Sequence, residues 1–336
     1  MTRFNLQSVS FALLVLALVS IGRGSGSDSG RVPQTQEADA LSFTAQVKAV
    51  AEISLPEDAE LESPAPPAVS HGEATIAVGR TLTSLHPESA RPKVISPTVI
   101  AAAAFVGEIG NPYPLFEKNT ESRWALASLT KLMTALVAKK VFSSGETIII
   151  TPDAIAEEGN AGGFREGEMY TAKELIEAML VTSSNDAAFA LAEHYGFPKF
   201  LEEMRRQTVA LGMQQTSFFD VAGLSVLNQG TAWDLERLAT FLLETHPEIL
   251  EITAKPTTAI TELGTQMTRK LQSTNRFAGT PGFIGGKTGY TGEAGGNLIS
   301  VFDEKGRRFL IIVFGSDDRF SETETLRSWI RNNFTL

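Results

Sequence analysis

Three groups of polar residues in this chain have the types and the spacing that acyl transfer requires. They are Ser128 with Lys131, Ser183 with Asn185, and Lys287 with Thr288 and Gly289. A serine hydroxyl becomes a strong nucleophile when a neighbouring base removes its proton, and a lysine that has lost its own proton is such a base. The other two groups offer hydroxyl, amide and ammonium groups that could bind a peptide and its carboxylate.

The Gly-Lys-Thr at residues 286–288 also resembles the end of a nucleotide-binding P-loop. A P-loop reads Gly, four residues, then Gly-Lys-Ser/Thr, but the position of its first glycine is Pro281 here. The glycine-rich residues 290–296 do not favour the helix that a P-loop opens. We therefore interpret the stretch as a strand whose lysine and threonine hold a carboxylate, while Gly289 lets a ligand backbone come close.

The Ser128 and Lys131 pair lies at the start of a predicted amphipathic helix. Apolar residues recur at a helical spacing, at Leu129, Leu132, Met133, Leu136, Val137 and Val141. Ser128 and Lys131 would share one face of this helix, about a turn apart. Burial near the positive end of the helix dipole would favour the neutral, basic form of the lysine. For this pair alone, an N-cap serine beside a solvated lysine is the simpler alternative.

The Ser183 and Asn185 pair lies in a polar break, residues 182–185, between two predicted helices. An apolar stripe marks the first helix, at Leu175, Ile176, Met179 and Leu180. Asp186 is expected to cap the second helix and Gly196 to end it. Two buried helices would hold the break rigidly, although alone it could be an ordinary loop.

Four apolar runs predict strands. Residues 298–302 and 309–314 are strong β runs joined by a turn at residues 303–306, and residues 282–291 form a third strand beside them. Residues 98–106 are a further β-like run. The last helix is expected to begin with a capping box formed by Ser321 and Glu324.

The composition excludes several classes of function. The chain has 336 residues, 43% of them hydrophobic, and a formal net charge of −10, which argues against a nucleic-acid partner. It has no cysteine, so disulfides and thiolate chemistry are excluded. Its four histidines have no metal-ligand spacing, and we expect neither a metal nor a cofactor.

The N-terminus predicts export. Arg3 precedes an uncharged stretch, residues 4–22, which resembles an export signal and is just long enough to span a bilayer, at about 17–25 residues. Since its possible cleavage site, residues 20–22, is poor, residues 1–22 are expected to be a signal peptide or a membrane anchor. A buried core helix is the simpler alternative. Residues 23–95, rich in Gly, Ser, Pro and acidic residues, are expected to be a disordered linker, and residues 96–336 a folded catalytic domain.

Together, in this order, the three groups are the Ser-x-x-Lys, Ser-x-Asn and Lys-Thr-Gly motifs of penicillin-binding proteins and serine β-lactamases. The stretches "ASLTKLMTA", "SSNDAA", "LGMQQTSFFDVAGLS", "TAWDLERLA" and "GGKTGYTGEAG" closely resemble the low-molecular-mass D-alanyl-D-alanine carboxypeptidases. The resemblance extends over about residues 98–332. It implies an α+β, β-lactamase/DD-peptidase-like fold, in which an antiparallel sheet is flanked by helices and a helical subdomain is added.

The resemblance also implies roles for individual residues. Ser128 would be the nucleophile, Lys131 its base and Ser183 a proton relay to the leaving amine. Asn185 would bind the peptide amide of the substrate, and Lys287 and Thr288 its terminal carboxylate. The backbone N–H groups of Ser128 and Tyr290 would form the oxyanion hole. The implied substrate is a peptidoglycan stem peptide ending in D-Ala-D-Ala, and β-lactam antibiotics would be covalent inhibitors.

Some alternatives stay open. Family members also include endopeptidases that cut peptide cross-links, and a non-catalytic penicillin-binding sensor could keep all the motifs. A class A β-lactamase needs a Glu four residues before an Asn between the second and third motifs, but Leu224 and Leu271 precede Asn228 and Asn275. Many carboxypeptidases of this group carry a β-rich domain and a membrane-binding helix after the catalytic domain. We expect residues 1–22 to replace that anchor and hold the enzyme at the outer face of the cytoplasmic membrane, in the periplasm or in the cell wall.

Overall fold

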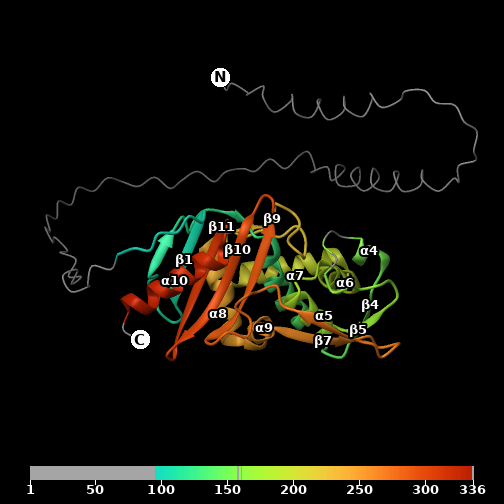
Figure 1. Cartoon of the computed structure of the whole chain (residues 1–336). Coiled ribbons are helices and arrows are strands. Elements are labelled where there is room, and N and C mark those ends of the chain that lie inside the picture. The colour runs from blue at the N-terminus through green and yellow to red at the C-terminus, as the bar shows by residue number, and fades with distance from the viewer. Residues whose placement is uncertain (1–94, 157–158, 160, 335–336) are drawn as a thin grey trace, which may run out of the picture. The chain divides into compact units, whose positions relative to one another are not determined.

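The computed structural model describes residues 95–156, 159 and 161–334 (Figure 1). The expected export segment, residues 1–22, and the expected linker up to residue 94 lie outside the described residues. Across the part of the chain that the structure describes, no helix is both long and apolar enough to cross a membrane.

A five-stranded antiparallel sheet in the order β2-β1-β11-β10-β9 forms the centre of the described fold. Its strands are β1 (Ala103–Glu108), β2 (Phe116–Lys118), β9 (Phe283–Thr291), β10 (Gly295–Glu304) and β11 (Arg307–Ser316). The pairing of β1 with β11 joins the first strand of the fold to its last strand. The three apolar runs near the C-terminus were predicted as neighbouring strands, and this prediction is confirmed.

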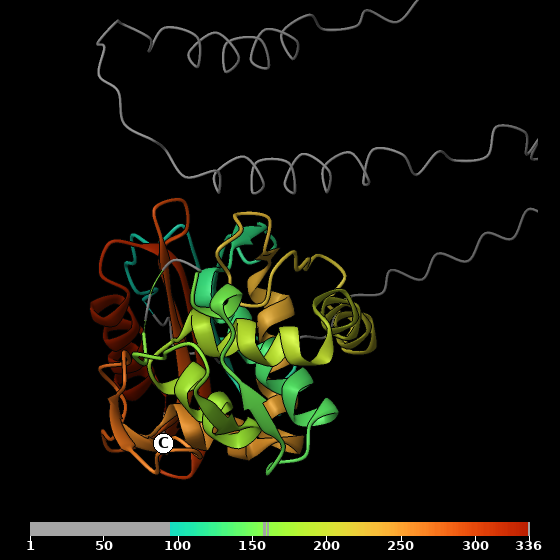
Figure 2. The same ribbon diagram turned by 90° about the vertical axis from the view of Figure 1, so that its right-hand side faces the viewer.

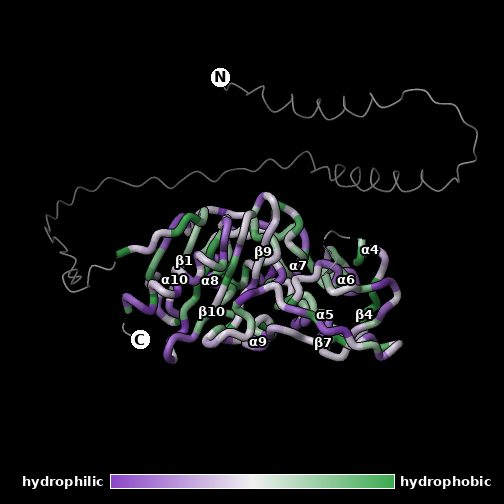
Figure 3. The backbone as a smooth tube through the Cα atoms, in the orientation of Figure 1, coloured by the Kyte–Doolittle hydropathy of each residue, from purple (hydrophilic) through white to green (hydrophobic). Residues whose placement is uncertain are grey.

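Both faces of the sheet are covered, which explains the continuous apolar sequence of β11. Leu310, Ile312 and Phe314 face one hydrophobic cluster, while Phe309, Ile311 and Val313 face another. Successive side chains of a strand point to opposite faces, so a strand buried on both faces is apolar at every position. β1 and β11 accordingly contain long hydrophobic stretches in Figure 3.

Helices lie on both sides of this sheet. Figure 2 shows α10 (Arg319–Asn333) on one side of the red strands and the green helices of the helical subdomain on the other. The subdomain contains α3 (Thr130–Val141), α4 (Pro152–Ile155), α5 (Ala172–Val181), α6 (Asn185–Tyr195) and α7 (Phe197–Ala210). α8 (Ala232–Thr245) and α9 (Pro247–Thr253) connect the subdomain to the sheet. Three short strand pairs complete the fold: β3 (Trp124–Ala125) with β6 (Gln229–Gly230), β4 (Thr147–Ile149) with β5 (Met169–Thr171), and β7 (Thr257–Thr261) with β8 (Thr268–Gln272). This is the expected α+β architecture.

Helix α3 is the central helix of the subdomain. All residues from Thr130 to Ala138 are buried, because α5, α6, α7 and α9 pack around it. Polar groups on its surface therefore need internal partners. The Thr134 hydroxyl donates to the carbonyl oxygen of Val221 at 2.6 Å.

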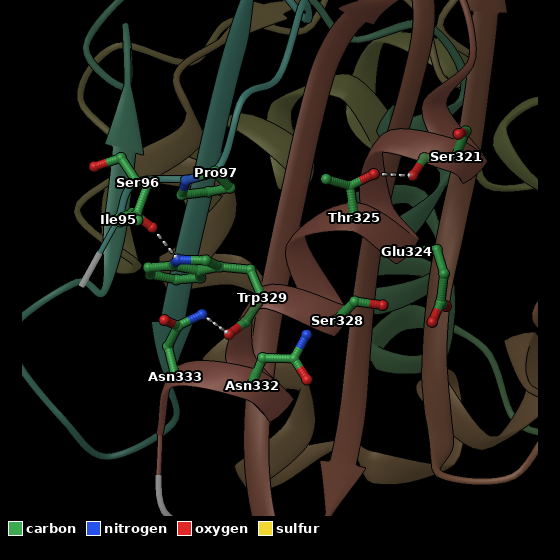
Figure 4. Close-up of a pocket in the computed structure, with 10 residues that line it drawn as sticks. All are labelled: Ile95, Ser96, Pro97, Ser321, Glu324, Thr325, Ser328, Trp329, Asn332 and Asn333. Carbon is green, nitrogen blue, oxygen red and sulfur yellow. Dashed lines mark hydrogen bonds between the residues drawn. The ribbon is translucent and has the colours of Figure 1, made fainter.

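The described chain begins in a groove beside α10 (Figure 4). Trp329 Nε1 donates a hydrogen bond to the carbonyl oxygen of Ile95 at 2.8 Å. Further along, the backbone N–H of Ala101 donates to the carboxylate of Glu322. These contacts attach the entry of the chain to its last helix, on the face of the sheet that α10 covers.

Two predicted helix caps are wrong. The cap of α6 is Ser184, whose side chain accepts from the N–H of Ala187, so Asp186 lies inside the first turn. The cap of α10 is Asp318, which accepts from Phe320 and Ser321, so no capping box begins at Ser321. In both cases an earlier polar side chain reaches the unpaired N–H groups of the first turn. Gly196 ends α6 with φ of +98°, as predicted.

Candidate active site

The segment that carries Ser128 is a short 3₁₀ turn, Ala127–Leu129, placed directly before α3. Ala127 has φ of +48°, an unusual value for a residue with a side chain, and the chain turns sharply there. Asn297 of β10 donates to the carbonyl oxygens of Ala125 and Leu126, which fixes the turn against the sheet. Ser128 is partly exposed at the end of a buried helix.

Lys131 lies one helical turn further on and is fully buried. Its Nζ is 3.0 Å from Ser128 Oγ, 2.7 Å from Asn185 Oδ1 and 2.7 Å from the carbonyl oxygen of Ala222. Burial lowers the pKa of Lys131 from 10.5 to about 7, and the nearby carboxylate of Asp220 opposes this shift. A substantial fraction of Lys131 is therefore neutral at pH 7.

The three partners of Lys131 determine where its lone pair points. A protonated lysine has three N–H donors, whereas a neutral amine has two donors and one lone pair. The carbonyl oxygens of Ala222 and of the Asn185 side chain can only accept, so they take the two N–H groups of the neutral amine. The lone pair then faces Ser128 Oγ, as proton removal from that hydroxyl requires.

Ser183 lies in the break between α5 and α6, in a strained conformation with φ of +63°. Such strain in a non-glycine residue is concentrated at functional sites. Its Oγ accepts a hydrogen bond from Lys287 Nζ at 2.8 Å. Asn185, the first residue of α6, meets Lys131 from the same break. The structure thus joins all three sequence motifs through these two contacts.

Lys287, Thr288, Gly289 and Tyr290 follow one another on β9, which pairs with β10. Burial, then the charges of Lys131 and Arg319, hold the pKa of Lys287 well below its usual value. The hydroxyls of Thr288 and Thr274 are 3.0 Å apart. Tyr290 is 68% exposed, so its ring does not belong to the buried part of the site.

Gly289 permits the close approach of β9 to the Ser128 turn. A Cβ atom there would lie 3.0 Å from the carbonyl oxygen of Leu126 and 3.1 Å from the backbone nitrogen of Ser128. Both distances are tighter than ordinary contacts of a methyl group. The glycine therefore leaves the Ser128 N–H accessible beside the strand.

Arg319 is a candidate site residue that the sequence analysis missed. It lies in the first turn of α10, with its Nη1 only 3.3 Å from where a Cβ of Gly296 would be, and Gly296 pairs with Tyr290 of β9. Its Nε is buried and has no hydrogen-bond partner among the described residues. The available signal was a cation at a helix N-terminus, where the dipole disfavours positive charge.

Arg276 is a second cation on the same aromatic ring as Arg319. The guanidinium carbons of Arg276 and Arg319 lie 4.8 Å and 5.1 Å from the ring centroid of Phe320. Within the described ranges, no group of three or more His, Asp or Glu residues could hold a metal ion.

The sheet, the helical subdomain and the Ser128–Lys131 pair together define the fold class of the penicillin-binding proteins and DD-peptidases. The family model of D-alanyl-D-alanine carboxypeptidases, peptidase S11, matches residues 91–318. The chain belongs to this family.

Comparisons with individual proteins agree with this assignment. The chain is 32% identical to D-alanyl-D-alanine carboxypeptidase DacF of Bacillus subtilis over 211 residues, which cover 60% of this chain and 54% of that protein. It is 28% identical over 241 residues to a D-alanyl-D-alanine endopeptidase of Pseudomonas aeruginosa, covering 68% of this chain and 77% of the relative. Thus the chain matches only about half the length of the carboxypeptidase.

The fold is similar to that of penicillin-binding protein D2 of Listeria monocytogenes in its ampicillin-bound form. The TM-score is 0.60 at 34% identity, and the match covers 68% of this chain and 96% of that one. The match therefore covers nearly the whole length of the Listeria chain.

Proposed function

We propose that this protein is a serine-type D-Ala-D-Ala carboxypeptidase that removes the terminal D-Ala from peptidoglycan stem peptides. The observation that carries the proposal is the buried Lys131, whose Nζ contacts Asn185 Oδ1, the Ala222 carbonyl oxygen and Ser128 Oγ. In the neutral form, the first two contacts take its N–H groups and leave the lone pair for Ser128. This arrangement has a role in acyl transfer and no evident role in a purely structural helix.

In the first half of the reaction, Ser128 Oγ attacks the carbonyl carbon of the penultimate D-Ala while Lys131 takes the hydroxyl proton. The peptide C–N bond then breaks, and the leaving amine receives the proton that Lys131 took, relayed by Ser183, which is hydrogen-bonded to Lys287. The products are free D-Ala and an ester between the shortened peptide and Ser128. In the second half, water attacks this ester, which releases the peptide acid and restores the Ser128 hydroxyl.

The remaining residues would bind the substrate and stabilise the developing charge. The N–H groups of Ser128 and Tyr290 would hold the oxyanion, and Gly289 leaves room for it beside the strand. Asn185 would bind the peptide amide. Lys287, Thr288 and Arg319, whose Nε has no partner among the described residues, would hold the terminal carboxylate.

Ser128→Ala tests the nucleophile. Wild-type protein incubated with a fluorescent penicillin should gain the mass of one penicillin, and Ser128→Ala should gain none. Ser144→Ala, which removes an exposed serine on a surface loop, is the matched control and should be labelled normally. An adduct that persists in Ser128→Ala would show that another residue is acylated.

A second candidate function is cleavage of peptide cross-links, because endopeptidases are among the relatives. Release of D-Ala from a stem pentapeptide and cleavage of a cross-linked dimer should therefore be measured on the same preparation. We expect faster D-Ala release. Acylation by penicillin without turnover of either substrate would indicate a sensor, and rapid penicillin hydrolysis a β-lactamase.

We also propose that the protein acts outside the cytoplasm, since peptidoglycan stems are its substrate, and that residues 1–22 direct its export. The uncharged stretch at residues 4–22 is long enough to remain as a membrane anchor. The linker of residues 23–95 would let an anchored domain reach wall at varying distance.

A further inference from the structure

The Ala222 carbonyl oxygen, which accepts from Lys131, belongs to a loop, residues 220–225, whose backbone is hydrogen-bonded to the carboxylate of Asp220. Asp220 Oδ1 accepts from the backbone N–H groups of Ala222 at 2.7 Å and Gly223 at 2.5 Å, and Oδ2 accepts from Ser225 at 2.6 Å. With the N–H of Leu224, which also donates to Oδ1 at 3.3 Å, four charge-assisted hydrogen bonds to one side chain define the conformation of residues 220–225. The loop therefore holds the Ala222 carbonyl oxygen 2.7 Å from Lys131 Nζ.

The same loop packs directly against the nucleophile turn. Gly223 has φ of +87°, and a Cβ atom there would lie 1.9 Å from the carbonyl oxygen of Ala127. Only glycine is compatible with both the conformation and the contact. Small movements of this loop would thus reach Ser128 through Ala127 and Lys131 through Ala222.

Asn228 connects this loop to the helix that carries Lys131, and its side chain is fully buried. Its Oδ1 accepts from the N–H groups of Phe219 at 2.7 Å and Asp220 at 3.2 Å. Its Nδ2 donates to the carbonyl oxygen of Asp220 at 3.0 Å and to Thr130 Oγ1 at 3.1 Å. All four hydrogen-bonding positions of the amide are used.

The backbone of Asn228 makes a third connection. Its carbonyl oxygen accepts from the N–H of Leu126 at 2.8 Å, two residues before Ser128. One residue thereby bonds to the segment before the nucleophile, to the helix of the base, and to the loop that supplies the acceptor of the base. Within the described residues, these contacts give Asn228 no direct bond to Ser128 or Lys131.

We infer that Asn228 is a positioning residue, which sets the geometry between Ser128, Lys131 and the Ala222 carbonyl. The inference rests on the proposed acyl-transfer function. Without the Asn228 amide, the Asp220 loop would lose one of its bonds to α3 and keep the bond between Thr134 and Val221. The Ala222 carbonyl oxygen, which accepts the second N–H of neutral Lys131, would then be held less firmly. The lone pair would in turn be held less firmly toward Ser128 Oγ.

Two variants test this role. Asn228→Ala removes the whole amide, and Thr130→Val removes only its bond to α3 without changing the volume of the side chain. The measurement is the acylation rate of each variant by a fluorescent penicillin, at saturating and subsaturating concentration, between pH 5.5 and pH 9. Because a misplacement of about 1 Å can slow an enzyme on the order of 100-fold, we expect acylation to fall about 10- to 100-fold in Asn228→Ala, and less in Thr130→Val.

The initial binding of penicillin should change little, since the carboxylate-binding residues are untouched. The pH midpoint of acylation should rise in Asn228→Ala, because water admitted by a loosened loop reduces the burial that lowers the pKa of Lys131. A rate loss caused only by partial unfolding would leave this midpoint unchanged.

Two controls match the test variants. Thr208→Val removes a buried hydroxyl on α7 that bonds only within its helix, and Glu262→Gln weakens a buried polar cluster at the β7–β8 turn. Both should retain the wild-type acylation rate and pH midpoint. If Asn228→Ala and Thr130→Val also retain them while only the melting temperature falls, Asn228 is structural and the inference is wrong. A wild-type chain that is not acylated at all would instead contradict the proposed function.

Discussion

Lys131 Nζ lies 3.0 Å from Ser128 Oγ, across the boundary between the 3₁₀ turn Ala127–Leu129 and helix α3. The three-residue spacing places both side chains on one face, and the burial of α3 removes water from the lysine. The same helix thus supplies the proximity of the pair and the low dielectric that makes its base neutral.

Replacement of Lys131 by arginine separates charge from basicity. Lys131→Arg keeps a cation, but guanidinium does not give up a proton at working pH. We expect acylation by penicillin to fall at least about 1,000-fold, because general-base catalysis contributes roughly 100- to 10,000-fold and the larger group also disturbs Asn185. Intact-mass time courses measure this directly. Acylation within a few-fold of wild type would mean that Lys131 acts only through its charge.

The acylation rate should rise with pH and level off above a midpoint near 7. Only neutral Lys131 can take the Ser128 proton, and burial lowers its pKa to about 7. At 1.5 pH units below the midpoint the neutral fraction, and hence the rate, should be on the order of 30-fold below the plateau. A stopped-flow series between pH 5.5 and 9 measures the profile. A rate that is constant over this range, or that falls as pH rises, would contradict Lys131 as the base.

The same shift affects stability. Lys131 in the unfolded chain keeps its proton up to about pH 10.5, whereas the folded protein loses it near pH 7. The unfolded state therefore binds more protons between these values, and this residue destabilises the fold less as pH rises from 7 to 10.5. Burial of this lysine lowers the stability of the fold, and the proposed catalytic role explains why the lysine is nevertheless buried.

Sequence patterns were sufficient for the elements whose burial is periodic or continuous. The apolar run of β11 and the helical spacing of α3 both predicted the observed structure. Hydrogen bonds between side chains and a loop backbone produce no periodic spacing of residues in the sequence. The Asp220 loop and the role of Asn228 in it were therefore invisible before the fold was known.

Helix caps and Arg319 were missed for related reasons. Ser184 and Asp186 are both acceptable caps by type, and only the path of the chain decides which side chain reaches the free N–H groups. The proximity of Arg319 to β9 depends on how α10 packs across Gly296. That packing is a long-range contact, which the local signal, a cation at a helix N-terminus, does not reveal.

Fractionation of cells that express the full chain tests the proposed anchor. If residues 1–22 stay attached, the protein should be found in the membrane fraction with its original N-terminus. Sequencing the mature N-terminus and measuring penicillin labelling in each fraction provide the measurement. A soluble form that begins near Arg23 would show cleavage and leave the catalytic proposal unchanged.

Arg319 should recognise the terminal carboxylate of the substrate, since its buried Nε lacks a partner among the described residues and its charge acts on Lys287. A hydrogen bond to a charged group contributes about 1.5–3 kcal/mol, so Arg319→Ala should raise KM for a D-Ala-D-Ala peptide by about 10- to 100-fold. The effect on kcat should be smaller, because this contact exists before the reaction begins. Arg319→Lys should recover part of the loss.

A peptide ending in D-alaninamide makes this test specific, because it lacks the carboxylate charge. Wild-type protein and Arg319→Ala should bind this neutral peptide similarly. Their KM values should differ only for the peptide that ends in a free carboxylate. Arg276→Ala is the matched control, since Arg276 packs on the same Phe320 ring but is exposed, and it should change KM much less. If Arg319→Ala weakens the binding of the peptide acid and of the peptide amide equally, Arg319 shapes the site but does not bind the carboxylate charge.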